Sequence, residues 1–94
     1  MIVSIDHLKQ HLRIQQDDED DLLMSLLLQA QITAENFCFT TFGDTAPEPV
    51  RLAVILMASH FYEYRDASDR FAIRAMRIAF ESLLWPYRDV TKLI

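Results

Sequence analysis

Residues 47–67, PEPVRLAVILMASHFYEYRDA, decide how the rest of the chain is arranged. Pro47 and Pro49 suit the first turn of a helix, where a missing N–H group loses no intrahelical partner. Uninterrupted apolar residues follow over 52–58, so we expect no face of this helix to lie in water. A run of about a dozen apolar residues is too short to cross a bilayer, which takes roughly 20. The stretch therefore predicts a central, buried helix.

This helix ends in a segment rich in aromatic and polar side chains, SHFYEYRD at residues 59–66. His60 and Glu63 are i, i+3 neighbours and could act as a base and its orienting group, but a catalytic pair also needs a nucleophile or a metal. We therefore interpret His60, Tyr62, Glu63 and Arg65 as a rim that fixes the next loop or a subunit contact. The chain shows no glycine-rich phosphate loop, no Cys/His ligand set and no nucleophile elbow, so we expect neither catalysis nor a cofactor.

Composition favours an all-α class. The chain has 94 residues, of which 51% are apolar, with one glycine and three prolines. So few turn residues argue against a sandwich or barrel of short strands. A domain of this size buries only about 60 to 65% of its unfolded surface, so we expect part of the apolar surface to be covered by another subunit.

We expect one domain over residues 1–94, a bundle of about four helices. It should contain two long antiparallel helices, a short N-terminal helix and a C-terminal helix. Ser4 is the expected N-cap of the first helix, and Asp17 or Asp18 of the second. Gly43 is expected to close the second helix in the left-handed conformation. The predicted helices cover residues 5–12, 18–40, 48–66 and 71–85, with a tail at 86–94.

Apolar spacing predicts the buried faces of the second and last helices. The second helix should bury Leu23, Leu27, Ala30, Ala34 and Phe37, and the last helix Phe71, Ile73, Met76, Phe80, Leu83 and Leu84. The side chains near the end of the second helix are expected to fill one end of the core. They are Phe37, Cys38, Phe39 and Phe42.

Charge is unevenly distributed along the chain. Residues 1–48 carry two basic and nine acidic side chains, and residues 49–94 carry seven basic and five acidic ones, so the halves sum to −7 and +2. Complementary potentials orient association, and we expect the acidic run of one copy to face the arginine stripe of the next. The expected contact comprises Asp18, Glu19, Asp20 and Asp21 on one side and Arg70, Arg74 and Arg77 on the other. An ordinary solvated helix end remains the alternative.

The sequence pattern gives only weak support for each of three possible ligand sites. The acidic run 17–21 lacks the alternating ligands, central glycine and distal glutamate of a calcium loop. His7 and His11 are spaced for a shared metal, but no third ligand follows at a recognisable spacing. Three arginines on an acidic protein are a weak signal for nucleic acid. The single cysteine, Cys38, and an N-terminus without signal-peptide features indicate a reducing cytoplasm.

Three segments together resemble the small head-to-tail connector, or head-completion, proteins of long-tailed bacteriophages and prophages. They are LKQHLRI at 8–14 followed by DDEDDLL at 17–23, PVRLA at 49–53 through HFYEYR at 60–65, and LLWPYR at 83–88. Two segments depart from the family pattern. Residues 39–44 read FTTFGD where relatives often carry a TGR-like turn, and residues 70–73 read RFAI where a proline is usual.

The resemblance implies an all-α, non-catalytic structural protein of the virion head–tail junction, made in the bacterial host cytoplasm. It implies a homo-oligomeric ring of about twelve subunits under the capsid portal, which keeps packaged DNA inside and lets the tail attach. The implied partners are other copies of the chain, the portal protein and a tail-completion protein, with no membrane and at most non-specific DNA contact in the channel.

The C-terminal tail contains apolar and aromatic residues that we expect to dock on the portal or on a neighbouring copy, namely Trp85, Pro86, Tyr87 and Arg88. Two other functions remain open from the residues alone. A small DNA-binding or packaging-accessory regulator would bind DNA through its arginines in a salt-sensitive way. A helical adaptor would instead form a fixed heterodimer.

Overall fold

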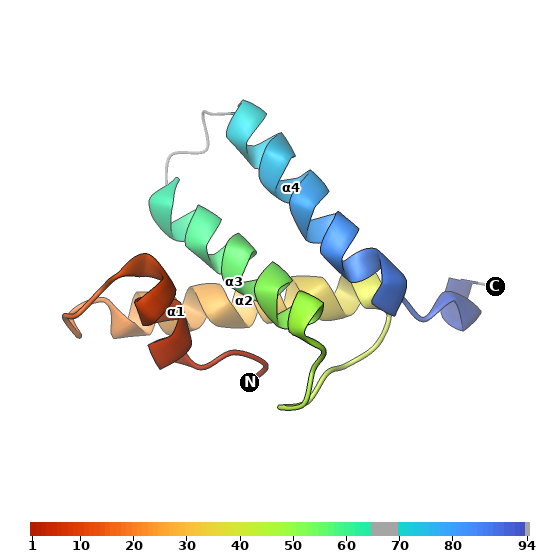
Figure 1. Ribbon diagram of the computed structural model, residues 1–94, viewed down its shortest axis with the longest axis horizontal. Helices are drawn as coiled ribbons and strands as arrows, with labels where there is room; N and C mark the ends of the chain where they lie inside the picture. Colours follow the sequence, from red (N-terminus) through yellow and green to blue (C-terminus); the bar gives the residue numbers. More distant parts are fainter. Residues whose placement is uncertain (65–69, 94) are drawn as a thin grey trace.

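The helix at the centre of the fold is α3 (Glu48–Glu63), which packs against α1, α2 and α4 (Figure 1). The computed structural model describes residues 1–64 and 70–93. Pro47 is the N-cap of α3 and Pro49 lies in its first turn, as the sequence predicts. The helix buries Val50, Ala53, Val54, Ile55, Met57 and Ala58. The prediction that every face is covered is wrong at Leu52, which is 43% exposed, because the neighbouring helices leave part of α3 uncovered.

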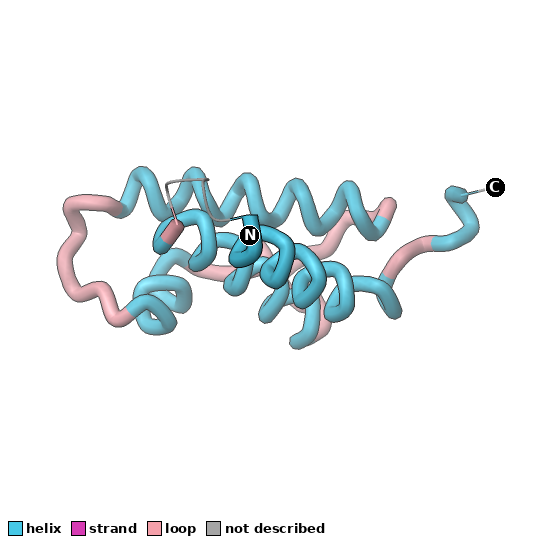
Figure 2. Tube along the Cα trace, turned by 90° about the horizontal axis from the view of Figure 1, so that it is seen from above, coloured by secondary structure: helices cyan, strands magenta, loops and turns pink. Residues whose placement is uncertain are grey.

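The other helices are α1 (Ile5–Leu12), α2 (Asp20–Cys38) and α4 (Arg70–Leu84), followed by two short 3-10 turns, η1 (Trp85–Tyr87) and η2 (Val90–Leu93). The described ranges contain no strand, which confirms the all-α class. Helices α2 and α4 both run opposite to α3 (Figure 1). Viewed from above, α2 forms one layer, and the remaining helices form the other (Figure 2). The molecule is flat, with extents of 45 × 31 × 17 Å.

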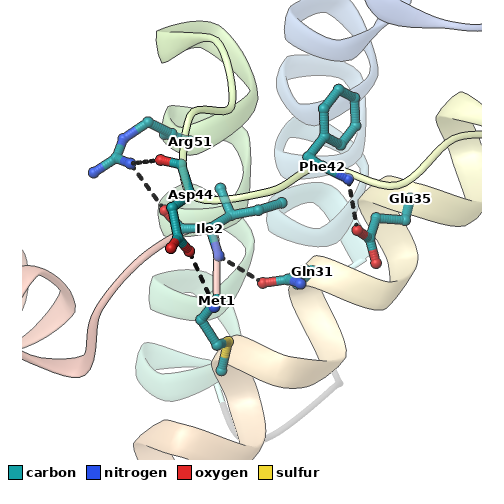
Figure 3. Close-up of polar contacts among 7 residues, drawn as sticks. All are labelled: Met1, Ile2, Gln31, Glu35, Phe42, Asp44 and Arg51. Atoms are coloured by element: carbon teal, nitrogen blue, oxygen red, sulfur yellow. Dashed lines mark hydrogen bonds and ion pairs between the residues drawn. The ribbon is translucent and has the colours of Figure 1, made fainter.

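The extended N-terminal segment closes one side of the core. Ile2 and Val3 are almost fully buried. The Ile2 N–H donates to Gln31 Oε1 on α2 at 2.8 Å, and the Ile2 carbonyl accepts from Arg51 Nη1 on α3 at 3.0 Å (Figure 3). The terminal ammonium of Met1 lies 3.6 Å from Asp44 Oδ1. These contacts join the first residues to both long helices.

Two of the three predicted helix caps differ from the structure. The Ser4 hydroxyl accepts from the His7 N–H at 3.1 Å, which confirms the first cap. The N-cap of α2 is Glu19, without a side-chain cap bond, so the prediction of Asp17 or Asp18 is wrong. The Asp17 carboxylate instead binds Lys9.

The end of α2 also differs from the prediction. Phe39, not Gly43, adopts the left-handed conformation, with φ 56°. Its N–H donates to the carbonyl of Glu35, so the left-handed residue that closes α2 lies four residues before the glycine. The Glu35 side chain then accepts from the Phe42 N–H at 2.9 Å and fixes the loop that follows (Figure 3).

Helix α4 presents one face to α3 and leaves another uncovered. Phe80 and Leu84 are buried, as predicted, and Ile73 and Met76 are half-buried. The prediction that Phe71 joins this face is wrong, because its side chain is 84% exposed. At about 100° per residue, Phe71 lies on the opposite side of the helix from Phe80.

Candidate subunit interface

The acidic run before α2 is partly neutralised within the subunit. The buried ammonium of Lys9 on α1 donates to Asp17 Oδ1 at 2.6 Å and to Asp20 Oδ1 at 2.9 Å. These hydrogen bonds raise the pKa of Lys9 to about 12 and lower the pKa of Asp17. The lysine therefore links the loop between α1 and α2 to the start of α2.

The predicted acceptors Asp18, Glu19, Asp20 and Asp21 consequently differ in availability. Glu19 Oε1 accepts from the Tyr62 hydroxyl at 2.7 Å, and Asp20 pairs with Lys9. Asp18 and Asp21 are exposed, and neither makes an ion pair with another described residue. The negative surface available to a partner at this end of α2 is therefore mainly that of Asp18 and Asp21.

The rim residues come from the end of α3. His60 is buried and stacks on Tyr64 with ring centroids 4.9 Å apart. Tyr62 reaches across to Glu19, so it ties the end of α3 to the start of α2. Glu63 is exposed, and Arg65 lies outside the described residues.

A groove of about 340 Å³ runs between α3 and α4 beside this rim. His11, His60 and Glu63 contribute polar atoms, and the walls are mostly apolar. The apolar lining residues are Leu56, Ala72, Ala75, Met76 and Ala79. In the described part of the chain, no three His, Cys, Asp or Glu side chains group closely enough to hold a metal ion. No helix found there is long and apolar enough to span a membrane.

The predicted arginine stripe lies on one side of α4. Arg70, Arg74 and Arg77 are all exposed. Arg77 Nε lies 3.3 Å from Glu81 Oε1, one helical turn further on, whereas Arg70 and Arg74 have no ion-pair partner among residues 1–64 and 70–93. The structure does not bring this stripe together with the acidic run of the same subunit, which leaves both charged surfaces exposed.

The segment after α4 folds back onto the end of α2. The guanidinium of Arg88 lies over the rings of Phe37, Trp85 and Phe39, at 4.4, 4.8 and 5.1 Å from their centroids. Its Nε donates to the Phe37 carbonyl at 2.9 Å, and the Asp89 N–H donates to the Cys38 carbonyl at 2.8 Å. Of the predicted docking residues, Arg88 is thus engaged within the subunit.

The other three docking residues differ in exposure. Trp85 and Pro86 are exposed, and Tyr87 is half-buried. Trp85 is therefore the large side chain of this segment that is most available to a partner.

Two exposed apolar stripes were missed by the sequence reasoning. On α4 and at the first residue of η1, Phe71, Ile78 and Trp85 are 84%, 57% and 62% exposed. On α2, the large apolar side chains exposed along its outer side are Met24, Leu28 and Ile32. The signal was present as a spacing of seven on α4 and of four on α2, each of which keeps residues on one helix face.

The comparisons with known proteins agree with this architecture. A family model described as phage gp6-like head-tail connector protein matches residues 2–88, which include all of α1, α2, α3 and α4. No curated protein and no solved structure matches the chain.

Proposed function

The chain belongs to the phage gp6-like head-tail connector family, and from this premise we propose that its copies form a closed ring under the capsid portal. The family is one of structural, non-enzymatic phage proteins. In the proposed arrangement the ring, of about twelve subunits, joins the portal protein to a tail-completion protein. It also helps to retain packaged DNA, which it contacts at most non-specifically in the channel.

The observation that carries this proposal is that one subunit exposes two surfaces of opposite charge. Asp18 and Asp21 present negative charge beside α2, whereas Arg70 and Arg74 present positive charge on α4. The accessible surface of 6303 Å² also exceeds the about 5,600 Å² expected of a folded monomer of this mass. Both features are typical of a subunit that is completed by its neighbours.

Two surfaces of opposite charge on each subunit favour a ring over a two-fold dimer. A head-to-tail contact leaves one surface of each kind free at the ends of a chain of subunits, and the chain closes when the rotation per subunit allows. In this arrangement the arginine stripe of α4, Arg70, Arg74 and Arg77, supplies the donors, and the acidic residues at the start of α2 of the next copy are the acceptors. Complementary charge mainly fixes the orientation of the contact.

Native mass spectrometry across a concentration series tests the ring. We expect a discrete species of many subunits, either from the protein alone or after the portal protein is added. The double charge reversal R74E/R77E should abolish this species while leaving the helical circular dichroism unchanged. Arg13→Glu is a matched control, because Arg13 is an exposed arginine at the end of α1 and not part of the arginine stripe of α4. A protein that stays monomeric with the portal protein present would overturn the proposal.

The segment after α4 supports a second contact, with the portal or with a neighbouring copy. Trp85 is 62% exposed, whereas Arg88 and Asp89 bind the carbonyls of Phe37 and Cys38 at the end of α2. Truncation after Trp85 should weaken attachment to the portal protein in a pull-down experiment. Unchanged attachment would remove this segment from the portal contact.

A further inference from the structure

Three large apolar side chains lie in a row along the outer side of α4 and the start of η1. Phe71, Ile78 and Trp85 follow one another at intervals of seven residues, so their directions differ by only about 40° in total, and they form a stripe about 21 Å long. All three are more than half exposed. The positive charges of Arg70 and Arg74 lie along one edge of this α4 stripe. Large apolar side chains in such a row are typical of a surface that another helix covers.

The outer side of α2 offers a surface of similar length. Met24, Leu28 and Ile32 are each between 42% and 50% exposed. The exposed carboxylate of Asp21 lies at the beginning of this α2 stripe. A hollow of about 400 Å³ lies at its other end; it is lined by Ile32, Glu35, Asn36, Phe39, Thr40 and Thr41. The α2 stripe thus begins with negative charge and ends in a depression.

We propose that the α4 stripe of one copy packs on the α2 stripe of a second copy, with the two helices running in the same direction. Ile78 then lies beside Leu28, and Trp85 enters the hollow at the end of α2. The inference rests on the proposed ring and specifies which surfaces form it. It makes apolar packing the main source of affinity, because exposed ion pairs contribute little to stability.

Spacing allows this register, and charge favours the parallel orientation over the reverse one. Asp21, Leu28 and Glu35 are separated by seven residues, as are Phe71, Ile78 and Trp85, so the two series advance together at about 10.5 Å per step. The register places Asp21 next to Phe71, within reach of the flanking Arg70 and Arg74. The reverse orientation would place Glu81 near Asp21, where like charges repel, whereas in the proposed orientation Glu81 lies near Glu35, whose carboxylate already accepts from the Phe42 N–H.

Each copy would use its α4 stripe on one neighbour and its α2 stripe on the other. Pairing two α4 stripes with each other would leave both α2 stripes uncovered. Contact between α4 and α2 covers both kinds of surface in every subunit once the ring closes. This contact therefore accounts for all of the large apolar side chains in the two stripes.

Two substitutions block the two surfaces separately. Ile78→Asp places a charge in the α4 stripe, and Leu28→Asp places one in the α2 stripe; both positions are at least half exposed, so the fold should be retained. We expect each variant alone to lose every species larger than a monomer in native mass spectrometry. Leu52→Asp, at an exposed apolar position on α3, is the matched control and should assemble like the wild type.

Mixing the two blocked variants gives the decisive result. The Ile78→Asp copy keeps its α2 stripe and the Leu28→Asp copy keeps its α4 stripe, so an equal mixture should form a one-to-one dimer and nothing larger. In a second test, Leu28→Cys in one copy and Ile78→Cys in another should form an intersubunit disulfide. The native Cys38 is fully buried and should not compete.

The outcomes separate this contact from the ring itself. If both Asp variants still assemble like the wild type, the ring stands and the proposed contact is wrong. If only Ile78→Asp loses assembly and Leu28→Asp still forms dimers, two α4 stripes pair with each other. A wild-type protein that stays monomeric with the portal protein present overturns both proposals.

Discussion

Arg88 holds the segment after α4 on the end of α2, and its removal should release that segment while α2 and α3 stay folded. The guanidinium contacts three aromatic rings and donates to the Phe37 carbonyl. Arg88→Ala removes all of these contacts. Arg88→Lys keeps the positive charge, but it loses the planar group that stacks on rings while donating from Nε.

The magnitude follows from two contributions. A partly buried cation over aromatic rings contributes about 1 kcal/mol, and a hydrogen bond from a charged donor about 1.5 kcal/mol or more. The two are not additive, so we take about 2 kcal/mol for Arg88→Ala. Since about 1.4 kcal/mol corresponds to a factor of ten, opening of this segment should become about 30-fold more frequent.

Native-state hydrogen exchange at the Asp89 amide measures this opening. That N–H donates to the Cys38 carbonyl at 2.8 Å, so its protection reports whether the segment is docked. Arg88→Ala should lower the protection by about 30-fold, and Arg88→Lys by a smaller factor. Arg13→Ala is the matched control, because Arg13 is exposed and lies at the end of α1.

Unchanged protection of Asp89 in Arg88→Ala would refute the reasoning, because the backbone bond would then hold without the arginine. Equal loss of protection throughout α2 would also refute it, because the segment would then open only with the whole domain. The expected pattern is loss at residues 85–91 with little change at the centre of α3.

Three further predictions concern stability of the monomer. Leu27→Ala should lower the free energy of unfolding by about 2 to 5 kcal/mol in urea because Leu27 is fully buried, whereas Leu28→Ala next to it should change it by less than about 0.5 kcal/mol. Ser4→Ala should lower it by about 1 kcal/mol through loss of the N-cap, with thermal unfolding as the measurement; no change would mean that the cap bond is negligible. Lys9→Gln should lower the melting temperature by a constant amount at neutral pH. This difference from the wild type should shrink as the pH falls below 3.8, the ordinary pKa of Asp17, and shrink again as the pH rises from 10.5, the ordinary pKa of Lys9, towards 12. A difference that does not depend on pH would contradict the ion pair.

Local sequence signals were sufficient where the determinant is local. Pro47 and Pro49 mark the start of α3, and Ser4 caps α1, because both effects act within one helical turn. The uninterrupted apolar run of α3 identified the central helix, since a helix without a polar face must be surrounded by others. The predicted bounds of α1, α2 and α4 lie within two residues of those observed, as does the predicted start of α3; the predicted end of α3 at residue 66 lies outside the described residues.

Long-range pairing explains what the sequence did not reveal. Asp17 is a good cap by residue type, but Lys9 on another helix binds its carboxylate. Tyr62 and Glu19 are 43 positions apart, a separation at which no spacing rule applies. On α4, Phe71 and Phe80 are both aromatic and in helical phase with other apolar residues, and only the position of α3 decides which of them is buried.

Trp85 is the chain's single tryptophan, and it lies where the end of α4, the Arg88 contact and the outer stripe meet. The subunit therefore carries an intrinsic fluorophore at the point where assembly would first change the solvent around an indole. An isolated subunit, with this ring 62% exposed, should emit at long wavelength. Insertion of the ring into a neighbour should shift the emission to shorter wavelength, so assembly can be followed in real time without an attached dye.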